Sequence, residues 1–304
     1  MTLTASDTRA PGQDLSPQPR TRILAGRLLA ALLLAVVLGA AAFRSTGGRW
    51  LMVTTSSMGA AAPVGTLLLT RPISAGQVRI GEIIAFHPPS GPSRSFSHRV
   101  IGIGPDGGLQ TKGDLNGATD PWTLHDSDLT GRVVLRGWGL GWLLRALPLL
   151  IVGMGTVWLA TRRRPPHRWH LPARLLGGSL LFAVAGVLLK PFVAMSVITT
   201  ASTGGGTTLS VVSTGLLPVR VRASGGDHVD LMSGQLGAIT ARSPHPGAAY
   251  HLSVGPHMPL LWWLAVGLIC VIPLGLGLIL TPRPSTTDEL PSQPADPRRL
   301  APTS

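Results

Sequence analysis

Four long apolar stretches divide the chain, and each has about the length of a membrane crossing. A helix needs roughly 20 predominantly apolar residues to span the hydrocarbon layer of a bilayer. The stretches cover residues 23–43, 138–161, 175–195 and 258–280. We therefore expect four transmembrane helices.

Two of these stretches admit a second interpretation. The first ends in the small residues 39–42, so a cleavable signal peptide is the alternative to a permanent anchor. Lys190 and Pro191 interrupt the third stretch. A lysine within a span marks a functional site or, near the interface, extends its ammonium group to the water.

Segments 44–137 and 196–257 carry a different pattern. Short apolar or β-branched runs alternate there with turns rich in Gly and Pro, and no helical period is sustained. We expect an all-β domain in the first segment and a smaller β domain in the second. The expected strands cover residues 51–53, 65–69, 80–86, 99–103, 131–135, 207–212, 217–221 and 236–240. The expected fold class is a membrane-anchored, mainly β protein.

The composition favours a membrane protein over a soluble one. Of the 304 residues, 44 % are hydrophobic and 13 % are charged. The formal net charge of +13 is also compatible with nucleic-acid binding. The arginines, however, gather beside the apolar stretches and form no face that mixes aromatic and basic residues. We interpret them as topology signals and expect no nucleic-acid partner.

The basic residues also predict an orientation. The segment 162–174 is the densest in arginine, and short basic loops face the cytoplasm. This arrangement places both β segments on the extracellular side and both termini inside the cell. The tails, residues 1–22 and 281–304, are polar and Pro-rich, which is typical of disorder. We expect a multi-pass protein of the cell membrane.

The first β segment carries four side chains that together suggest hydrolytic chemistry. Ser57, His98, Asp114 and Asp120 occur in this order between strand-like runs. A serine hydrolase needs a nucleophilic hydroxyl, a base within reach and an acid that orients the base.

We expect neither a metal ion nor another cofactor. His98, His125, Asp120 and Asp126 lack the short paired spacing of zinc ligands. The single cysteine, Cys270, lies in an apolar stretch and cannot form a disulfide within the chain.

Four boxes in this window resemble the type I signal peptidases, specifically the endoplasmic-reticulum and archaeal type. The boxes are Ser57-Met58 with Gly65-Thr66, then residues 81–86, 98–101 and 112–116, the last followed by Asp120. The chain departs from the first family box in two places. Ala60 stands where the family has proline, and Thr66 stands where it has aspartate.

The base distinguishes the branches of this family. Ordinary bacterial members carry lysine in the slot that His98 occupies here. An imidazole is largely neutral near pH 7, whereas a lysine must first be desolvated. Histidine needs a carboxylate to orient it, and the resemblance implies Asp120, the later of the pair, with Asp114 supporting the site. Asp114 as the orienting acid is the alternative.

The resemblance implies a membrane-bound serine endopeptidase, a signal peptidase I, that removes signal peptides from exported preproteins at the outer membrane surface. Ser57 would be the nucleophile and His98 the general base. In lysine-type relatives a hydroxyl two residues before the nucleophile assists, and Thr55 occupies that slot. The expected partners are preproteins, the lipid bilayer and the secretion machinery. The alternative is a catalytically silent relative that binds or escorts exported proteins.

Overall fold

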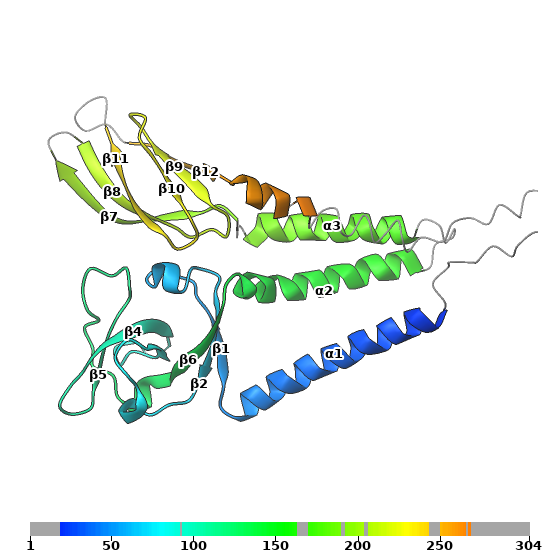
Figure 1. Cartoon of the computed structure of the whole chain (residues 1–304), viewed down its shortest axis with the longest axis horizontal. Coiled ribbons are helices and arrows are strands. Elements are labelled where there is room, and N and C mark those ends of the chain that lie inside the picture. Colours follow the sequence, from blue (N-terminus) through cyan, green and yellow to red (C-terminus); the bar gives the residue numbers. More distant parts are fainter. Residues whose placement is uncertain are drawn as a thin grey trace, which may run out of the picture.

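Two β domains lie at one end of a set of helices in the computed structural model (Figure 1). The structure describes residues 19–91, 93–162, 170–189, 192–203, 206–242, 250–265 and 267–268. The expected C-terminal tail, most of the N-terminal tail, most of the basic loop and most of the fourth apolar stretch lie outside these residues.

Three long helices leave the β domains in the same general direction (Figure 1). They are α1 (Pro19–Ser45), α2 (Leu140–Arg162) and α3 (His170–Leu189). Glycines allow α2 and α3 to pack closely. A Cβ atom added at Gly153 of α2 would lie 2.4 Å from a methyl carbon of Leu181 in α3.

The helices agree only in part with the expected membrane crossings. Within the described residues, α2 is the one helix whose length and apolar composition suffice to cross a membrane. Shorter apolar stretches cover Ala30–Ser45 of α1 and Ala173–Leu189 of α3. Four transmembrane helices thus stay a prediction. The third apolar stretch was expected to run to residue 195, but α3 ends at Leu189 and Met195 already begins a strand.

The first β domain is built on one antiparallel six-stranded sheet with the order β1-β2-β6-β3-β4-β5. Its strands are β1 (Arg49–Met52), β2 (Leu67–Arg71), β3 (Ile83–Phe86), β4 (Phe96–Ile103), β5 (Leu109–Lys112) and β6 (Leu129–Gly137). The apolar runs predicted five of these strands. The sequence interpretation missed β5, which is only four residues long and merges into the last of the four boxes.

Two apolar clusters form the core of this domain. One gathers around Phe86 and Val100, and the other joins β2 and β3 to Met58, which is 1 % exposed. Complete burial of such a side chain stabilises a fold by about 1.5–3 kcal/mol. Met58 directly follows Ser57, so the core anchors the chain beside the predicted nucleophile.

The second β domain is a sandwich of two three-stranded sheets, with orders β10-β9-β12 and β11-β8-β7. Its strands are β7 (Met195–Thr203), β8 (Gly206–Ser213), β9 (Val219–Ala223), β10 (His228–Leu231), β11 (Leu236–Ala241) and β12 (Leu252–Pro256). Val211 from one sheet and Val219 and Val221 from the other are fully buried in a shared core. The sheets therefore pack face to face.

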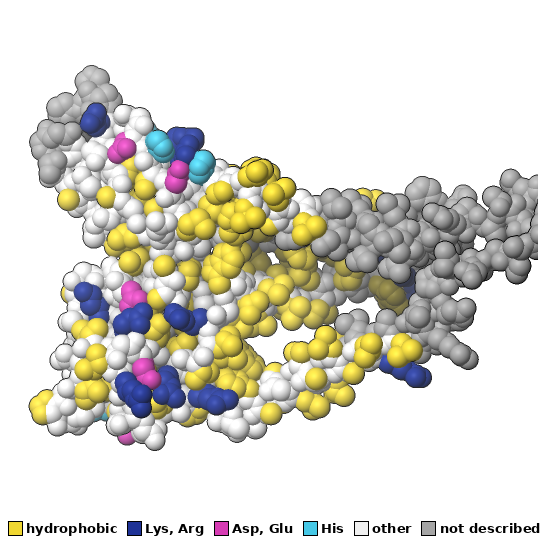
Figure 2. All heavy atoms as spheres, in the orientation of Figure 1, with side chains coloured by type: hydrophobic (Ala, Val, Ile, Leu, Met, Phe, Trp, Pro, Cys, Tyr) yellow, Lys and Arg dark blue, Asp and Glu magenta, His cyan; other side chains and the backbone are white. Residues whose placement is uncertain are grey.

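Charged side chains concentrate on the two β domains, whereas apolar side chains dominate the visible surface of the helices (Figure 2). Apolar residues of α1 such as Leu28, Leu32 and Val36 are 60–66 % exposed in the isolated chain. An apolar surface of this extent is expected to contact another apolar phase or another protein.

Candidate active site

Ser57 lies in the loop that follows β1. The buried side chain of Met58 holds this loop on the core, and the backbone N–H of Leu115 donates a hydrogen bond to the Ser57 carbonyl oxygen at 2.8 Å. Ser57 itself is half-buried. The backbone around the hydroxyl is thus held from two directions while the hydroxyl stays accessible.

His98 projects from β4 into the core of the first domain. Alternate side chains of a strand point to opposite faces, so His98 and Val100 are buried while Arg99 lies on the other face. The imidazole meets the rings of Phe86 and Phe96 at centroid distances of 6.0 and 5.8 Å, in edge-on geometry. These contacts fix the plane of the ring.

Asp120 is hydrogen-bonded to the inner nitrogen of this ring. Its Oδ2 atom lies 2.7 Å from Nδ1 of His98. The side chains of His98 and Asp120 are 5 % and 6 % exposed. Thr111 of β5 donates a second hydrogen bond to the same oxygen at 2.6 Å. The backbone N–H of Asp120 also donates to the carbonyl oxygen of Thr111 at 2.9 Å.

The outer ring nitrogen of His98 faces the serine. Nε2 of His98 lies 3.1 Å from Oγ of Ser57. A carboxylate at Nδ1 favours the tautomer with the proton on Nδ1, which leaves Nε2 free to accept a proton from the hydroxyl. Ser57, His98 and Asp120 therefore form one continuous hydrogen-bonded chain.

Asp114 lies outside this chain. It forms a two-pronged ion pair with Arg99, with 2.9 Å between Nε and Oδ1 and 2.7 Å between Nη2 and Oδ2. Hydrogen bonding to Asp114 raises the pKa of the Arg99 guanidinium above its ordinary value. The same guanidinium donates to the Gly81 carbonyl oxygen at 2.8 Å. Asp114 thus holds the turn of residues 113–116 on the sheet.

The remaining polar candidates contribute less. Oγ1 of Thr55 lies 3.5 Å from Oγ of Ser57, at the outer limit of a hydrogen bond. His87 is bonded to Ser95 and Thr130, away from the serine. Among the residues that the structure describes, no group of three or more His, Cys, Asp or Glu side chains is placed to hold a metal ion.

Sequence reasoning missed Thr111. This side chain is fully buried and orients the carboxylate that bonds His98. A buried hydroxyl must find a hydrogen-bond partner, so its place in the short alternating run from Leu109 to Lys112 was the available signal. The run was not recognised as a strand.

A donor for a developing oxyanion is also present. In the described part of the chain, the backbone N–H of Ser57 donates to no acceptor. Gly113 lies close by, since a Cβ atom there would come within 3.0 Å of Cβ of Ser57. The absence of a side chain at Gly113 keeps this side of the serine open.

A Ser-His-Asp hydrogen-bonded chain beside a backbone N–H that can donate to an oxyanion is the arrangement of serine hydrolases. Residues 25–111 match the model of one such family, described as signal peptidase, peptidase S26. The match covers Ser57 and His98, and it ends before Asp114 and Asp120. No curated protein matches the chain significantly. This part of the chain is therefore similar to signal peptidases, and the match supports that family.

Proposed function

We propose that this protein is a membrane-bound serine endopeptidase that removes signal peptides from exported preproteins. The hydrogen-bonded chain from Ser57 through His98 to Asp120 carries the proposal. The family match supports signal peptides as the substrate class. The proposed partners are these preproteins, the bilayer and the secretion machinery.

The geometry supports a two-step mechanism. Oγ of Ser57 attacks the scissile carbonyl carbon while Nε2 of His98 takes the hydroxyl proton. Asp120 stabilises the resulting imidazolium, and the Ser57 N–H donates to the oxyanion. His98 then passes its proton to the leaving amine. In the second step, His98 activates a water molecule that hydrolyses the acyl-enzyme and regenerates Ser57.

The identity of the base supports the endoplasmic-reticulum and archaeal type of enzyme. The chain has two lysines, Lys112 and Lys190. Lys112 lies in β5, where its pairing partner is Arg99 and not the serine loop. Nε2 of His98, in contrast, lies 3.1 Å from Oγ of Ser57, within hydrogen-bonding distance.

The proposed setting is the outer surface of the cell membrane. Ser57 follows the end of α1 by twelve residues, which span at most about 40 Å when fully extended. Both β domains lie at the same end of the helices (Figure 1). With the basic segment 162–174 in the cytoplasm, both domains would face outward and both termini inward.

A catalytically silent relative that binds or escorts exported proteins is the second candidate. The replacements Ala60 and Thr66 in the first box favour it. The intact chain from Ser57 to Asp120 favours an enzyme, because a binding protein has no need of a serine aligned on an oriented imidazole.

Processing of an exported substrate tests the proposal. We expect Ser57→Ala to abolish cleavage while the protein accumulates in the membrane at the parental level. Ser56→Ala is the matched control, because its hydroxyl makes no hydrogen bond with the described residues. This control should process the substrate at nearly the parental rate. Normal processing by Ser57→Ala would contradict the enzymatic function and leave the binding role.

A further inference from the structure

The two β domains touch at the loop that carries Ser57. The turn of residues 232–235, between β10 and β11, approaches Gly59 and Ala60. A Cβ atom added at Gly234 would lie 2.5 Å from the Gly59 carbonyl oxygen and 2.9 Å from Cα of Ala60. Glycine is thus required here by contact as well as by its φ of 75°.

The 232–235 turn is itself firmly held by the sandwich. The Gly234 N–H donates to the carbonyl oxygen of Ser213 in β8 at 2.8 Å. The Gln235 N–H donates to the Met232 carbonyl oxygen, and the Gln235 side chain accepts from the Met232 N–H, both at 2.9 Å. These hydrogen bonds fix the conformation of the turn, so the turn can limit the movement of Gly59 and Ala60.

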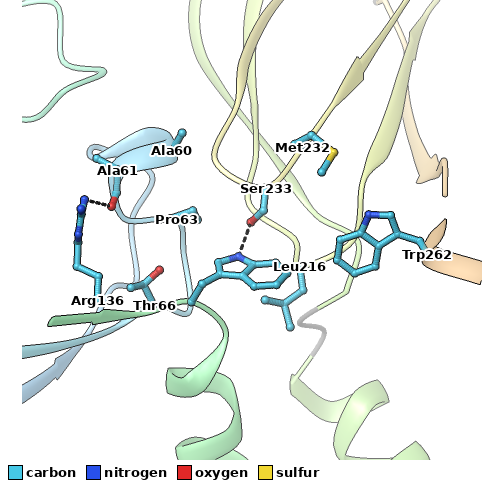
Figure 3. Close-up of a pocket in the computed structure, with 10 residues that line it drawn as sticks. Ala60, Ala61, Pro63, Thr66, Arg136, Leu216, Met232, Ser233 and Trp262 are labelled. Atoms are coloured by element: carbon cyan, nitrogen blue, oxygen red, sulfur yellow. Dashed lines mark hydrogen bonds between the residues drawn. The ribbon is translucent and has the colours of Figure 1, made fainter. Parts of the chain in front are cut away.

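Ser233, which precedes Gly234 in the chain, makes a side-chain contact with the first domain (Figure 3). The indole N–H of Trp138 donates to Oγ of Ser233 at 3.4 Å. The Trp138 ring packs edge-on against Trp262 with the centroids 6.1 Å apart. These residues border a hollow of about 530 Å³ between the domains, which Ala60 and Met232 also line.

The opposite side of the same loop rests on the first domain. Gly59 has a φ of 49°, and a Cβ atom there would lie 2.9 Å from Cγ of Leu115. Leu115 also donates its N–H to the Ser57 carbonyl oxygen. Arg136 donates to the Ala61 carbonyl oxygen at 2.8 Å. We call residues 57–61 the nucleophile loop, which is enclosed between the 113–116 and 232–235 turns.

We propose that the second β domain positions the nucleophile. Through Gly234 it closes the side of the nucleophile loop that the first domain leaves open, and so maintains the distance between Ser57 and His98. This inference rests on the proposed function. A displacement of about 1 Å at a reacting group can cost about 10²-fold in rate. Gly234 is thus a positioning residue that acts through the backbone of Gly59 and Ala60.

Gly234→Ala in the purified full chain tests the contact, with Gly226→Ala as the matched control. Gly226 lies in the turn between β9 and β10 with a φ of 92°, and a Cβ atom there would meet nothing within 4 Å. Both variants carry the backbone strain of alanine at positive φ, but only Gly234→Ala presses on the nucleophile loop. We expect Gly234→Ala to lower kcat about 10–100-fold with KM within about twofold. Gly226→Ala should keep the parental kcat.

A second variant and a labelling rate separate a positioning role from a loss of fold. Gln235→Ala removes the hydrogen bond from the Met232 N–H and so loosens the 232–235 turn, but it adds no atom where Gly234 meets Gly59. It should lower kcat several-fold with the parental KM. The rate at which a fluorophosphonate modifies Ser57 should fall in parallel with kcat in both variants, because it reports the alignment of Ser57 with His98 directly.

These experiments distinguish a failure of the positioning role from a failure of the proposed peptidase function. Equal processing by the parent and Ser57→Ala would refute the function, and this inference with it. An active parent whose Gly234→Ala and Gln235→Ala variants match Gly226→Ala in kcat and labelling rate would overturn only the positioning role. A variant whose melting temperature falls while its labelling rate stays parental would show that the turn stabilises the fold but does not position Ser57.

Discussion

The three groups of the hydrogen-bonded chain come from three different parts of the first domain. Ser57 follows β1, His98 lies on β4 and Asp120 follows β5. Asp120 and His98 are both almost completely buried, and a buried charge needs partners. Thr111 and the His98 Nδ1 supply them at 2.6 and 2.7 Å. These two hydrogen bonds orient the Asp120 carboxylate beside the imidazole.

Asp120→Asn should lower kcat by about 10⁴ while the melting temperature changes little. The amide NH2 group would donate a hydrogen bond to Nδ1 of His98, which places the ring proton on Nε2, so the wrong tautomer faces Ser57. The pH profile gives an independent readout. In the parent, cleavage should fall as acid protonates the base, because an imidazolium cannot accept the serine proton.

A parental rate in Asp120→Asn would contradict the orienting role. Cleavage by the parent that persists undiminished in acid would contradict His98 as the base.

At the scale of elements, the 113–116 turn carries the contacts that place the loop around Ser57. Leu115 donates to the Ser57 carbonyl oxygen, and Asp114 fixes the turn through Arg99. The pairing of β5 with β4, which sets Arg99 opposite Lys112 and Val100 opposite Thr111, holds in the sheet the strand that leads into this turn. The turn therefore supports the site from outside the hydrogen-bonded chain.

Asp114→Asn should lower both stability and activity, in contrast to Asp120→Asn. The pair with Arg99 is partly exposed, at 34 % and 28 % of the side chains, so its loss should cost about 1 kcal/mol in the free energy of unfolding. Looser placement of Leu115 should reduce kcat several-fold. Thermal melting and cleavage kinetics of both variants check this prediction. A stable but inactive Asp114→Asn beside an active Asp120→Asn would reverse the two roles.

At the scale of the whole molecule, the two β domains lie together at one end of a set of apolar helices (Figure 1). The turn of residues 232–235 reaches the nucleophile loop across about 175 residues of chain, since both domains lie at the same end of the helices. This shared placement is the geometry that a chain crossing a bilayer an even number of times between its two domains would adopt.

Cysteine labelling tests the proposed topology. In a Cys270→Ser background, His228→Cys in the second domain should react with a membrane-impermeant thiol reagent in intact cells. His167→Cys in the basic segment should react only after the membrane is permeabilised, because positively charged loops stay in the cytoplasm. Labelling of His167→Cys in intact cells would refute the orientation.

Patterns that are local in sequence predicted the two β domains and singled out Ser57, His98, Asp114 and Asp120 as candidate site residues. Alternating and β-branched runs predicted five strands of the first domain, and the boxes around Ser57 and His98 singled out these residues. The short strands β5, β10 and β12 were missed because four or five residues carry too little periodicity. The nine-residue strand β7 was also missed, and its first residue, Met195, lies in the stretch that was predicted to be a membrane crossing. The pairing of Asp114 with Arg99, and not with His98, also could not be derived from spacing.

Only the tertiary structure decided which side chains converge. Strand pairing brings Thr111 and Asp120 against His98, and the sandwich brings Gly234 against Gly59. The free energy of such contacts depends on burial and on the register between segments far apart in sequence. A sequence pattern records which face of its own segment is apolar. It does not record which distant segment will cover that face, and this is why the contact between the two domains became visible only in the folded chain.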